Sequence, residues 1–170
     1  MALEQRVARL FGLDDDGWAR HANPASGWSR AITGLPAIIL PAVSRIWIGW
    51  WAVPLALACI AWLILNPRLF APPPDDSAWM TRAVLGERMW VERGETGLLE
   101  AQGGLPTLLN LVSGLGFLVM AYGLVVLDWR FIAVGSAVSW TAKMLFIDRT
   151  RAIYDRVAAR DPSKAYKAPA

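Results

Sequence analysis

The feature that most constrains this chain is a run of twenty residues, from Ile46 to Leu65, that contains no charged side chain. As an α-helix, twenty residues rise about 30 Å, which is the thickness of the hydrocarbon core of a bilayer. A second uncharged run extends from Thr107 to Leu127, and a third, from Phe131 to Ile147, is interrupted only by Lys143. Each of these runs predicts a transmembrane helix.

The composition indicates the same environment. Of the 170 residues, 55% are hydrophobic and 18% are charged, whereas soluble domains have about 25% charged residues. The mean hydropathy is +0.36. A soluble domain of this size cannot bury so much apolar surface, and the same composition excludes intrinsic disorder. With one cysteine, a disulfide scaffold is excluded too. The lipid bilayer is therefore the expected environment of the chain.

Residues 24–43 can be interpreted in two ways. Their uncharged part, residues 31–43, is thirteen residues long, a length that also suits a re-entrant or interfacial segment. With residues 24–30 included, a helix of twenty residues forms, with Asn23 as its N-cap and Pro24 in the first position. Arg30 then reaches towards the lipid headgroups.

Charge counting favours the complete crossing. With spans at about 24–43, 46–65, 107–127 and 131–147, one side holds 14 of the 17 Lys and Arg residues and the other holds Arg45 and Arg130. Three spans give a much weaker asymmetry, so the positive-inside rule favours four. We therefore expect an all-α integral membrane protein with four transmembrane helices arranged as two helical hairpins. The expected location is the cell (cytoplasmic) membrane, with both termini cytoplasmic and no cleavable signal peptide.

Residues 1–170 are expected to form a single membrane domain, with a cytoplasmic linker at 66–106 and a basic cytoplasmic tail at 148–170. In the linker, residues 77–93 have an apolar and a charged face, which predicts an amphipathic helix capped by Ser77 and lying on the inner membrane surface. Residues 2–11 show a shorter version of this pattern. The last span is expected to remain helical up to Asp161. The basic tail predicts contact with anionic lipid, and no nucleic-acid partner is expected.

Polar residues in or beside the spans are the candidates for function, because polar groups in lipid are costly. They share a predicted place on the cytoplasmic face, as one candidate polar cluster: His21, Asn23, Asn66, Arg68, Glu87, Arg88, Asn110, Lys143, Asp148 and Arg149. Asn110 and Lys143 lie at similar depths in the last two spans, so they are able to meet across the second hairpin. Glu87 falls on the apolar face of the amphipathic helix and needs a cation, with Arg88, Arg20, Arg68 and Lys143 as the candidates.

His21 follows a run of aspartates, Asp14 to Asp16, in a grouping that resembles a metal site or an acid–base pair. A solvated charge run before a helix cap is the favoured interpretation, because one histidine is a weak metal signal. The chain has no phosphate-binding loop, zinc-protease motif or hydrolase nucleophile motif. No catalytic residue, cofactor or metal is predicted, and an enzyme is not the favoured class.

Two further patterns concern the packing of the spans. The last two spans contain small residues that allow close approach of the helix backbones: Gly114, Gly116, Ala121, Gly123, Ala133, Gly135, Ala137 and Ser139. The first hairpin contains Pro36, Pro41 and Pro54, which interrupt backbone hydrogen bonding. Such interruptions bind substrate or ions in some transporters, although simple kinks are commoner.

Six short segments in a fixed order give the chain a family resemblance. They are Trp18–Pro24, Trp28–Arg30, Ser44–Trp51, Asn66–Phe70, Leu85–Arg88 and Phe146–Arg149. Together they resemble the domain-of-unknown-function family 6653, over residues 11 to 155. The resemblance implies a small polytopic membrane protein of bacteria or archaea and no known activity. Ala25 replaces an aromatic residue that usually follows Asn-Pro in the family, and residues 94–104 are irregular.

Three functions remain open at this point. The favoured hypothesis is a non-enzymatic membrane protein whose cytoplasmic face binds lipid or a protein partner, either a second copy or another membrane protein. The first alternative is a small transporter or channel subunit that acts as an oligomer, because four short helices need partners to enclose a pathway. The second alternative is an enzyme at the membrane interface that uses His21 or Glu87.

Overall fold

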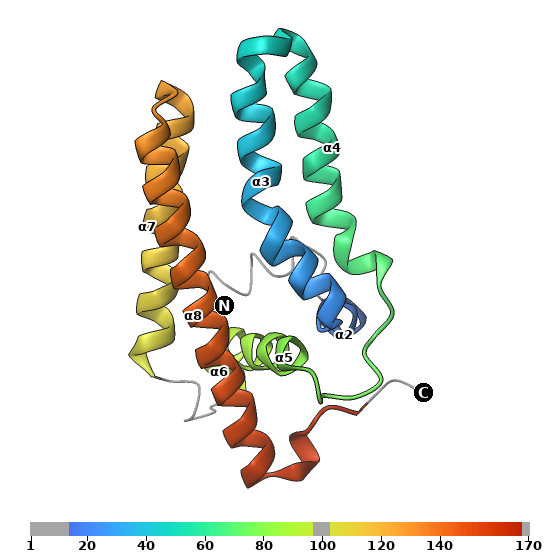
Figure 1. The fold of residues 1–170 in the computed structure, drawn as a ribbon. Coiled ribbons are helices and arrows are strands. Elements are labelled where there is room, and N and C mark those ends of the chain that lie inside the picture. Colours follow the sequence, from blue (N-terminus) through green and yellow to red (C-terminus); the bar gives the residue numbers. More distant parts are fainter. Residues whose placement is uncertain (1–13, 97–102, 168–170) are drawn as a thin grey trace. The chain divides into compact units, whose positions relative to one another are not determined.

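The computed structural model describes residues 14–96 and 103–167, which form helices joined by short connections (Figure 1). In chain order these are α2 (Asp15–His21), α3 (Pro24–Ile48), η1 (Gly49–Trp51), α4 (Ala52–Leu65), η2 (Asn66–Leu69), α5 (Trp79–Val91), α6 (Arg93–Thr96), α7 (Gly104–Val126), α8 (Trp129–Arg160) and η4 (Pro162–Lys164). The described ranges contain no strand, which confirms the all-α prediction. The predicted helix at residues 2–11 lies outside these ranges.

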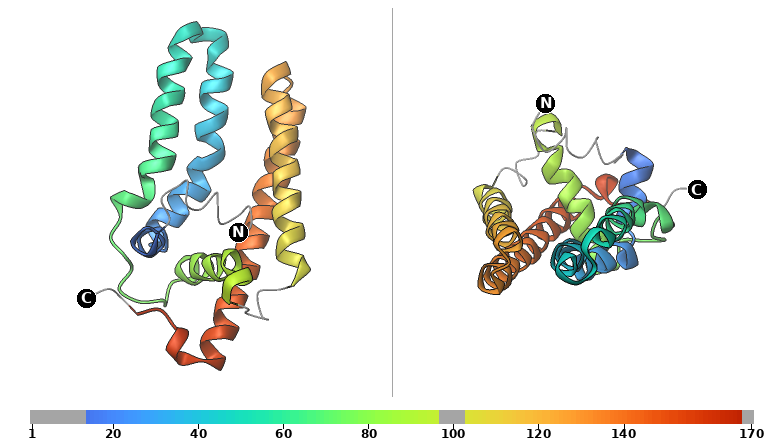
Figure 2. Two further views of the ribbon diagram at one scale, coloured as in Figure 1. Left: turned by 180° about the vertical axis from the view of Figure 1, so that it is seen from behind. Right: turned by 90° about the horizontal axis from the view of Figure 1, so that it is seen from above.

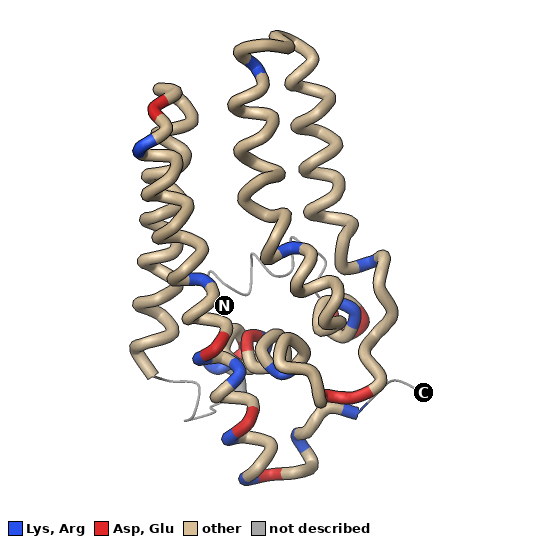
Figure 3. Tube along the Cα trace, in the orientation of Figure 1, with Lys and Arg blue, Asp and Glu red and all other residues tan. Residues whose placement is uncertain are grey.

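The described residues divide into two compact units. Those within Met1–Trp28, Pro67–Thr107 and Phe146–Ala170 form unit 1, and Ser29–Asn66 with Leu108–Leu145 form unit 2. Unit 2 contains five charged residues: Arg30, Arg45, Asp128, Arg130 and Lys143. Figure 3 shows that most of the other Lys, Arg, Asp and Glu residues lie along α2, α5 and the second half of α8. The chain is thus divided into an apolar and a charged unit.

Within residues 14–96 and 103–167, three helical stretches are long and apolar enough to cross a membrane, where the sequence predicted four spans. The difference arises because α3, η1 and α4 follow one another without a break, so that Pro24–Leu69 forms one stretch of 46 residues. Taken alone, α4 has 14 residues, which rise about 21 Å and fall short of a hydrocarbon core of about 30 Å.

This long stretch folds back on itself within unit 2. Two side-chain hydrogen bonds join its arms: Trp62 Nε1 donates to Thr33 Oγ1 at 3.0 Å, and Asn66 Nδ2 donates to Ser29 Oγ at 2.9 Å. Figure 2 shows α3 and α4 side by side as a hairpin. The predicted hairpin is therefore present, held by polar groups at its open end.

The first turn lies later in the chain than expected. The predicted first span ended at residue 43, with the turn at Arg45, whereas α3 continues to Ile48 and the turn is η1. Gly49 has a φ of 53°, which a glycine adopts without steric cost. Arg45 stays in the helix, and its guanidinium donates to the carbonyl oxygens of Leu124 at 2.8 Å and Val125 at 3.1 Å. These carbonyls belong to the negative end of the α7 dipole, which attracts a cation.

A second side chain joins the two hairpins of unit 2. Trp140 lies in α8, which belongs to the second hairpin. Its indole Nε1 donates to the backbone oxygen of Ala31 at 3.0 Å, so its polar group is satisfied within the protein.

Helices α7 and α8 touch along their backbones. A Cβ atom added at Gly116 would lie 2.6 Å from the backbone nitrogen of Ser139, and one at Gly135 would lie 2.3 Å from that of Met120. These distances confirm the close approach that the small residues predicted. Gly114 does not take part, because a Cβ there meets nothing within 4 Å.

The turn between α7 and α8 is compact. Leu127 has a φ of 58°, and the backbone N–H of Asp128 donates to the oxygen of Gly123 at 3.0 Å. This is the Schellman motif, in which a residue with a left-handed backbone conformation ends a helix. The Asp128 carboxylate then accepts a hydrogen bond from the backbone N–H of Arg130 at 2.9 Å and caps the start of α8.

In unit 1, the apolar face of α5 is covered by protein. A Cβ at Gly86 would lie 1.8 Å from the backbone oxygen of Thr150, so α5 crosses the C-terminal part of α8 in direct backbone contact. The Thr150 hydroxyl donates to Ala83 O at 3.0 Å, and Trp90 packs edge-on against Phe146 at 5.1 Å between ring centroids. The apolar pattern of residues 77–93 therefore reflects a protein core, and the prediction of a helix lying on the membrane surface was wrong in this respect.

The start of α5 also differs from the prediction. Ala78 is the N-cap residue, without a side-chain hydrogen bond. Ser77, the predicted cap, does not cap α5, because its hydroxyl and its backbone N–H both donate to the Asp75 carboxylate. At the other end of unit 1, α8 ends at Arg160 as predicted.

The contrast between two glycines of α7 tests the backbone contact in unit 2. Gly116→Ala places a methyl group against the α8 backbone and is expected to lower the free energy of unfolding by about 1–3 kcal/mol. Gly114→Ala is the matched control, because its methyl group meets open space. Thermal unfolding of both variants in mild detergent measures the difference. Equal melting temperatures for the two variants would contradict the contact.

Candidate functional site: the polar network of unit 1

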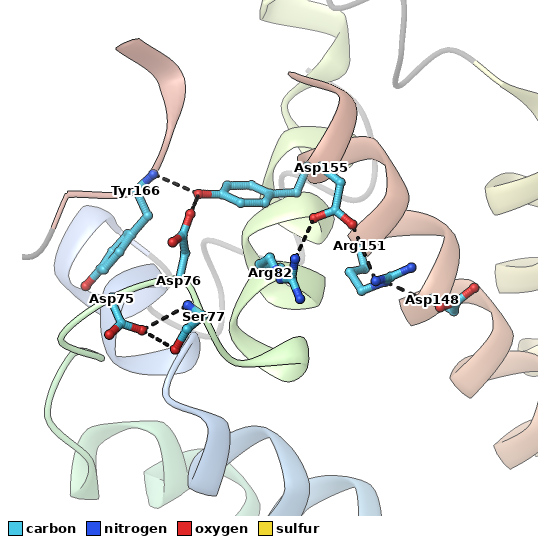
Figure 4. A network of polar contacts seen from close by, with 9 residues as sticks. Asp75, Asp76, Ser77, Arg82, Asp148, Arg151, Asp155 and Tyr166 are labelled. Carbon is cyan, nitrogen blue, oxygen red and sulfur yellow. Dashed lines mark hydrogen bonds and ion pairs between the residues drawn. The ribbon is translucent and has the colours of Figure 1, made fainter. Parts of the chain in front are cut away.

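Unit 1 contains a network of polar side chains from the linker, α5, α8 and the tail (Figure 4). We define the polar network by these members: Asp75, Asp76, Ser77, Arg82, Asp148, Arg151, Tyr154, Asp155 and Tyr166. Its residues are far apart in the sequence, so it depends on the packing of α5 against α8.

Tyr154 links the linker to the tail. Its side chain is 2% exposed, and its hydroxyl donates to Asp76 Oδ2 at 2.6 Å and accepts from the backbone N–H of Tyr166 at 2.8 Å. The Tyr166 hydroxyl in turn donates to the oxygen of Pro73 at 2.9 Å. These bonds fasten the chain beyond η4 to the proline-rich start of the linker.

Burial and the Asp76 carboxylate both oppose ionisation of Tyr154. Burial is the larger cause, and together they raise the pKa of its hydroxyl from its ordinary value of 10.0 to about 12. Tyr154 is thus protonated at neutral pH and acts as a hydrogen-bond donor. Its pKa is far too high for a general base.

The other half of the network consists of balanced ion pairs. Asp155 accepts a hydrogen bond from Arg82 at 3.3 Å and forms an ion pair with Arg151 at 3.4 Å, and Arg151 also lies 3.5 Å from Asp148. All four side chains are about one-third exposed, so water screens these pairs. Two arginines and two aspartates compensate each other, which leaves little net charge to attract a ligand.

A separate ion pair connects α2 to α5. Arg88 is bonded to Asp15 and, at 2.9 Å, to Glu92. Burial opposes the charged form of Arg88, but the two carboxylates outweigh it and raise the pKa of the guanidinium. Arg88 is one of the ten residues of the candidate polar cluster, and its partners are acidic residues that the sequence reasoning did not include in that set.

The candidate polar cluster is distributed over both units. Seven of its members belong to unit 1: His21, Asn23, Arg68, Glu87, Arg88, Asp148 and Arg149; three belong to unit 2: Asn66, Asn110 and Lys143. Asn23 caps α3 through the N–H of Ala25 at 2.9 Å and donates to Ala71 O at 2.8 Å. Asn66 is fully buried. Asn23, Asn66, Arg88 and Asp148 thus have structural partners outside the predicted set.

The remaining members differ in exposure. Arg68, Asn110 and Arg149 are exposed, whereas Glu87 and Lys143 are half-buried. The predicted meeting of Asn110 with Lys143 stays a prediction.

His21 lies beside carboxylates that already have partners. Its ring packs edge-on against Trp18 at 5.5 Å. Asp14 caps α2, Asp15 pairs with Arg88, and Asp16 pairs with Arg20 at 2.7 Å. In the part of the chain that the structure describes, no group of three His, Cys, Asp or Glu residues could hold a metal ion.

Sequence reasoning missed Tyr154 and Thr150 as structural centres. A signal was available, because Ile147, at the end of the last span, and Thr150, Tyr154 and Val157, in the tail, recur at helical spacing and are all buried. The partners of Tyr154, Asp76 and Tyr166, carry no such signal, since neither lies in a regular helix.

Comparison with known proteins gives one result for the whole chain. A family model described as a family of unknown function (DUF6653) matches residues 2–170. No curated protein and no solved structure matches.

The raised pKa of Tyr154 predicts a pH dependence of stability. Because the unfolded tyrosine ionises near pH 10 and the folded one near 12, the folded state holds its proton more tightly. The stabilisation is therefore complete below pH 10 and is lost as the pH rises from about 10 through about 12. Melting temperatures measured from pH 8 to pH 12 should fall less in Tyr154→Phe than in the wild type. A Tyr154→Phe slope equal to that of the wild type would contradict the prediction.

Proposed function

We propose that this chain, which belongs to the DUF6653 family of unknown function, is a multi-pass protein of the cell membrane with a non-enzymatic role in binding lipid or a protein partner. In this proposal unit 2 is the membrane part, and its α3–α4 hairpin crosses the bilayer in both directions, with η1 and η2 lengthening the short α4 arm at its two ends. Unit 1 and both chain ends face the cytoplasm.

The observation that carries this proposal is the surface of unit 2. Large apolar side chains on it are more than half exposed, among them Ile32, Leu57, Leu118 and Val125. Water-soluble monomers rarely expose apolar patches larger than a few hundred Å². Each Å² moved from water into lipid is favourable by roughly 25 cal/mol. A bilayer supplies cover for this surface, which the described residues leave exposed.

The tryptophans at the two turns of unit 2 support the same environment. Trp47, Trp50 and Trp51 lie at or beside η1, and Trp129 follows the turn between α7 and α8; all four are more than 70% exposed. Tryptophan is enriched where the hydrocarbon core meets the headgroups, since its ring is apolar and its N–H is polar.

Unit 1 supports a role in interaction rather than in transport of a substrate. It has its own core, in which Met80, Phe146 and Tyr154 are almost completely buried. The basic residues on its surface, such as Arg149, Arg156 and Lys164, are exposed. A folded unit with a basic surface is suited to bind an anionic lipid or an acidic protein.

The transporter alternative receives less support. That alternative was based on the expectation that prolines break the helices of the first hairpin, yet α3 continues as one helix through Pro36 and Pro41. Pro36 and Pro54 are exposed, and Pro41 is buried. The prolines therefore fit a kinked helix better than an unwound binding segment. The interface-enzyme alternative is also weakened, because the aspartates beside His21 have structural partners.

Two leucines of nearly equal exposure test the membrane location. Leu118, near the middle of α7, is 62% exposed, and Leu69, in η2, is 65% exposed. If lipid surrounds unit 2, Leu118→Arg places a charge near the middle of the bilayer at a cost of about 3 kcal/mol. We expect this variant to be depleted from carbonate-washed membranes, whereas Leu69→Arg accumulates at the wild-type level. Equal accumulation of both variants, or release of the wild-type protein by carbonate, would contradict the proposal.

A further inference from the structure

The chain that follows α8 forms a short segment with its own internal hydrogen bonds. We call residues 161–167 the strap: it consists of Asp161, η4 and the three residues after η4. The Asp161 carboxylate accepts from the backbone N–H of Ser163 at 3.1 Å, and its backbone oxygen accepts from the N–H of Lys164 at 3.0 Å. These bonds lie within the strap, so the strap keeps its shape when it moves as one piece.

The strap contributes little to the core of unit 1. None of its residues is buried: residues 162–164 and Lys167 are exposed, and the other three are half-buried. The preceding helix α8 carries Ile153 and Val157, which are at most 3% exposed. Segments with few buried apolar contacts open at a lower free energy than a core does. We therefore expect the strap to open while the core of unit 1 is still folded.

Tyr166 fastens the strap at its far end. Its backbone N–H donates to the Tyr154 hydroxyl at 2.8 Å (Figure 4), and its own hydroxyl donates to the oxygen of Pro73 at 2.9 Å. At the near end, the backbone N–H of Asp161 continues the hydrogen bonding of α8 by donating to Val157 O at 2.9 Å. The strap is thus hinged at Asp161 and latched at Tyr166.

The same latch holds the chain between η2 and α5. We call residues 72–77 the proline segment, because it begins with three consecutive prolines, which form a stiff piece. Pro73, to which Tyr166 bonds, is fully buried. Within the same segment, the Asp76 carboxylate accepts from the Tyr154 hydroxyl at 2.6 Å. The two tyrosines therefore join the proline segment, the strap and α8 through shared hydrogen bonds.

The Tyr154 hydroxyl couples the strap to the proline segment. It accepts from the strap and donates to the proline segment, and hydrogen bonds arranged in such a chain strengthen one another. When the strap opens, the proline segment loses the Tyr166 hydroxyl, and the bond to Asp76 loses its cooperative partner. Asn23 Nδ2 still donates to Ala71 O at 2.8 Å, next to the segment. Release is therefore confined to the proline segment.

We propose that the strap is a local conformational switch that opens as one piece about Asp161, with Tyr166 as its latch, and that its opening releases the proline segment while the core of unit 1 stays folded. The closed strap fixes the path of the chain from η2 to α5, and the open strap leaves that path free to extend. The strap, the proline segment and Tyr154 all belong to unit 1. The inference thus goes beyond the proposed function and does not depend on a membrane location.

Distances to α8, measured by electron paramagnetic resonance, test the proposal on the full chain in mild detergent. After Cys59→Ser, one spin label is attached through Arg156→Cys in α8. The second label is attached through Lys164→Cys in the strap or Pro74→Cys in the proline segment; these three positions are exposed. We expect one main distance for each pair and a minor population at longer distance, which is the same fraction in both pairs.

Loss of the latch should increase this longer population. Tyr166→Phe removes the hydroxyl that bonds to Pro73 and is expected to raise the population roughly two- to tenfold in both pairs, as the loss of one hydrogen bond predicts. Lys167→Ala is the matched control, because it changes an exposed neighbour of the latch, and it should leave both populations within about twofold. A rise confined to the strap pair, or a rise in neither pair, overturns the proposal.

Urea separates local opening from unfolding of unit 1. Below the unfolding transition, urea should leave the longer population almost unchanged, because opening of the strap exposes little surface. A longer population that rises with urea in step with the loss of helix would show that the strap opens only when unit 1 unfolds, and it would contradict the proposal.

A change outside the strap tests the coupling through Tyr154. Asp76→Ala removes the carboxylate to which Tyr154 donates, so it should raise the longer population of the strap pair about twofold or more. Asp75→Ala is the charge-matched control, because the Asp75 carboxylate bonds to Ser77 within the proline segment, and it should leave the strap pair unchanged. Equal behaviour of the strap pair in these two variants would contradict a shared latch.

Discussion

The structure depends on one constraint, which is that many large apolar side chains of unit 2 are exposed within the part of the chain that the structure describes. Paired helices bury only one side of each helix, and the outward residues of α7, such as Leu118 and Val125, remain exposed. With more than half of its residues hydrophobic, a chain of this length cannot fold around them. In the proposed membrane location, a bilayer supplies cover for these side chains.

Within such a surface, helices are held by contacts other than the hydrophobic effect, because lipid tails are as apolar as leucine. In unit 2, close backbone packing and side-chain hydrogen bonds join the helices. The α7–α8 pair is joined by backbone approach at Gly116 and Gly135, and the α3–α4 pair by side-chain hydrogen bonds to Ser29 and Thr33. Arg45 then joins the two hairpins by capping α7. Unit 1 instead has a buried core, in which the hydroxyls of Thr150 and Tyr154 form hydrogen bonds.

The sequence predicted helices well because apolar runs and helix caps are local signals. The start of α3 after Asn23 and the end of α8 before Asp161 follow from neighbouring residues, and the close approach at Gly116 follows from the small residues of both helices. The amphipathic pattern of α5 was ambiguous, since lipid and a protein core both require an apolar face. Gly86, which meets Thr150 more than sixty residues away, decides between them. The polar network was equally hidden, because Asp76, Tyr154 and Tyr166 are far apart in the sequence and are neighbours only in the folded unit 1. The candidate polar cluster was inferred from an expected membrane side and not from contacts, and its members belong to different units.

The most direct test of the account is the side of the membrane on which two exposed positions lie. Single cysteines are placed at Trp50, in η1, and at Ser163, in η4, after Cys59 has been replaced by serine. We expect a membrane-impermeant thiol reagent to label Trp50→Cys in intact cells and to label Ser163→Cys only after the membrane is permeabilised. Labelling of Ser163→Cys in intact cells, or equal labelling of both positions before permeabilisation, would contradict a membrane-spanning unit 2 with a cytoplasmic unit 1.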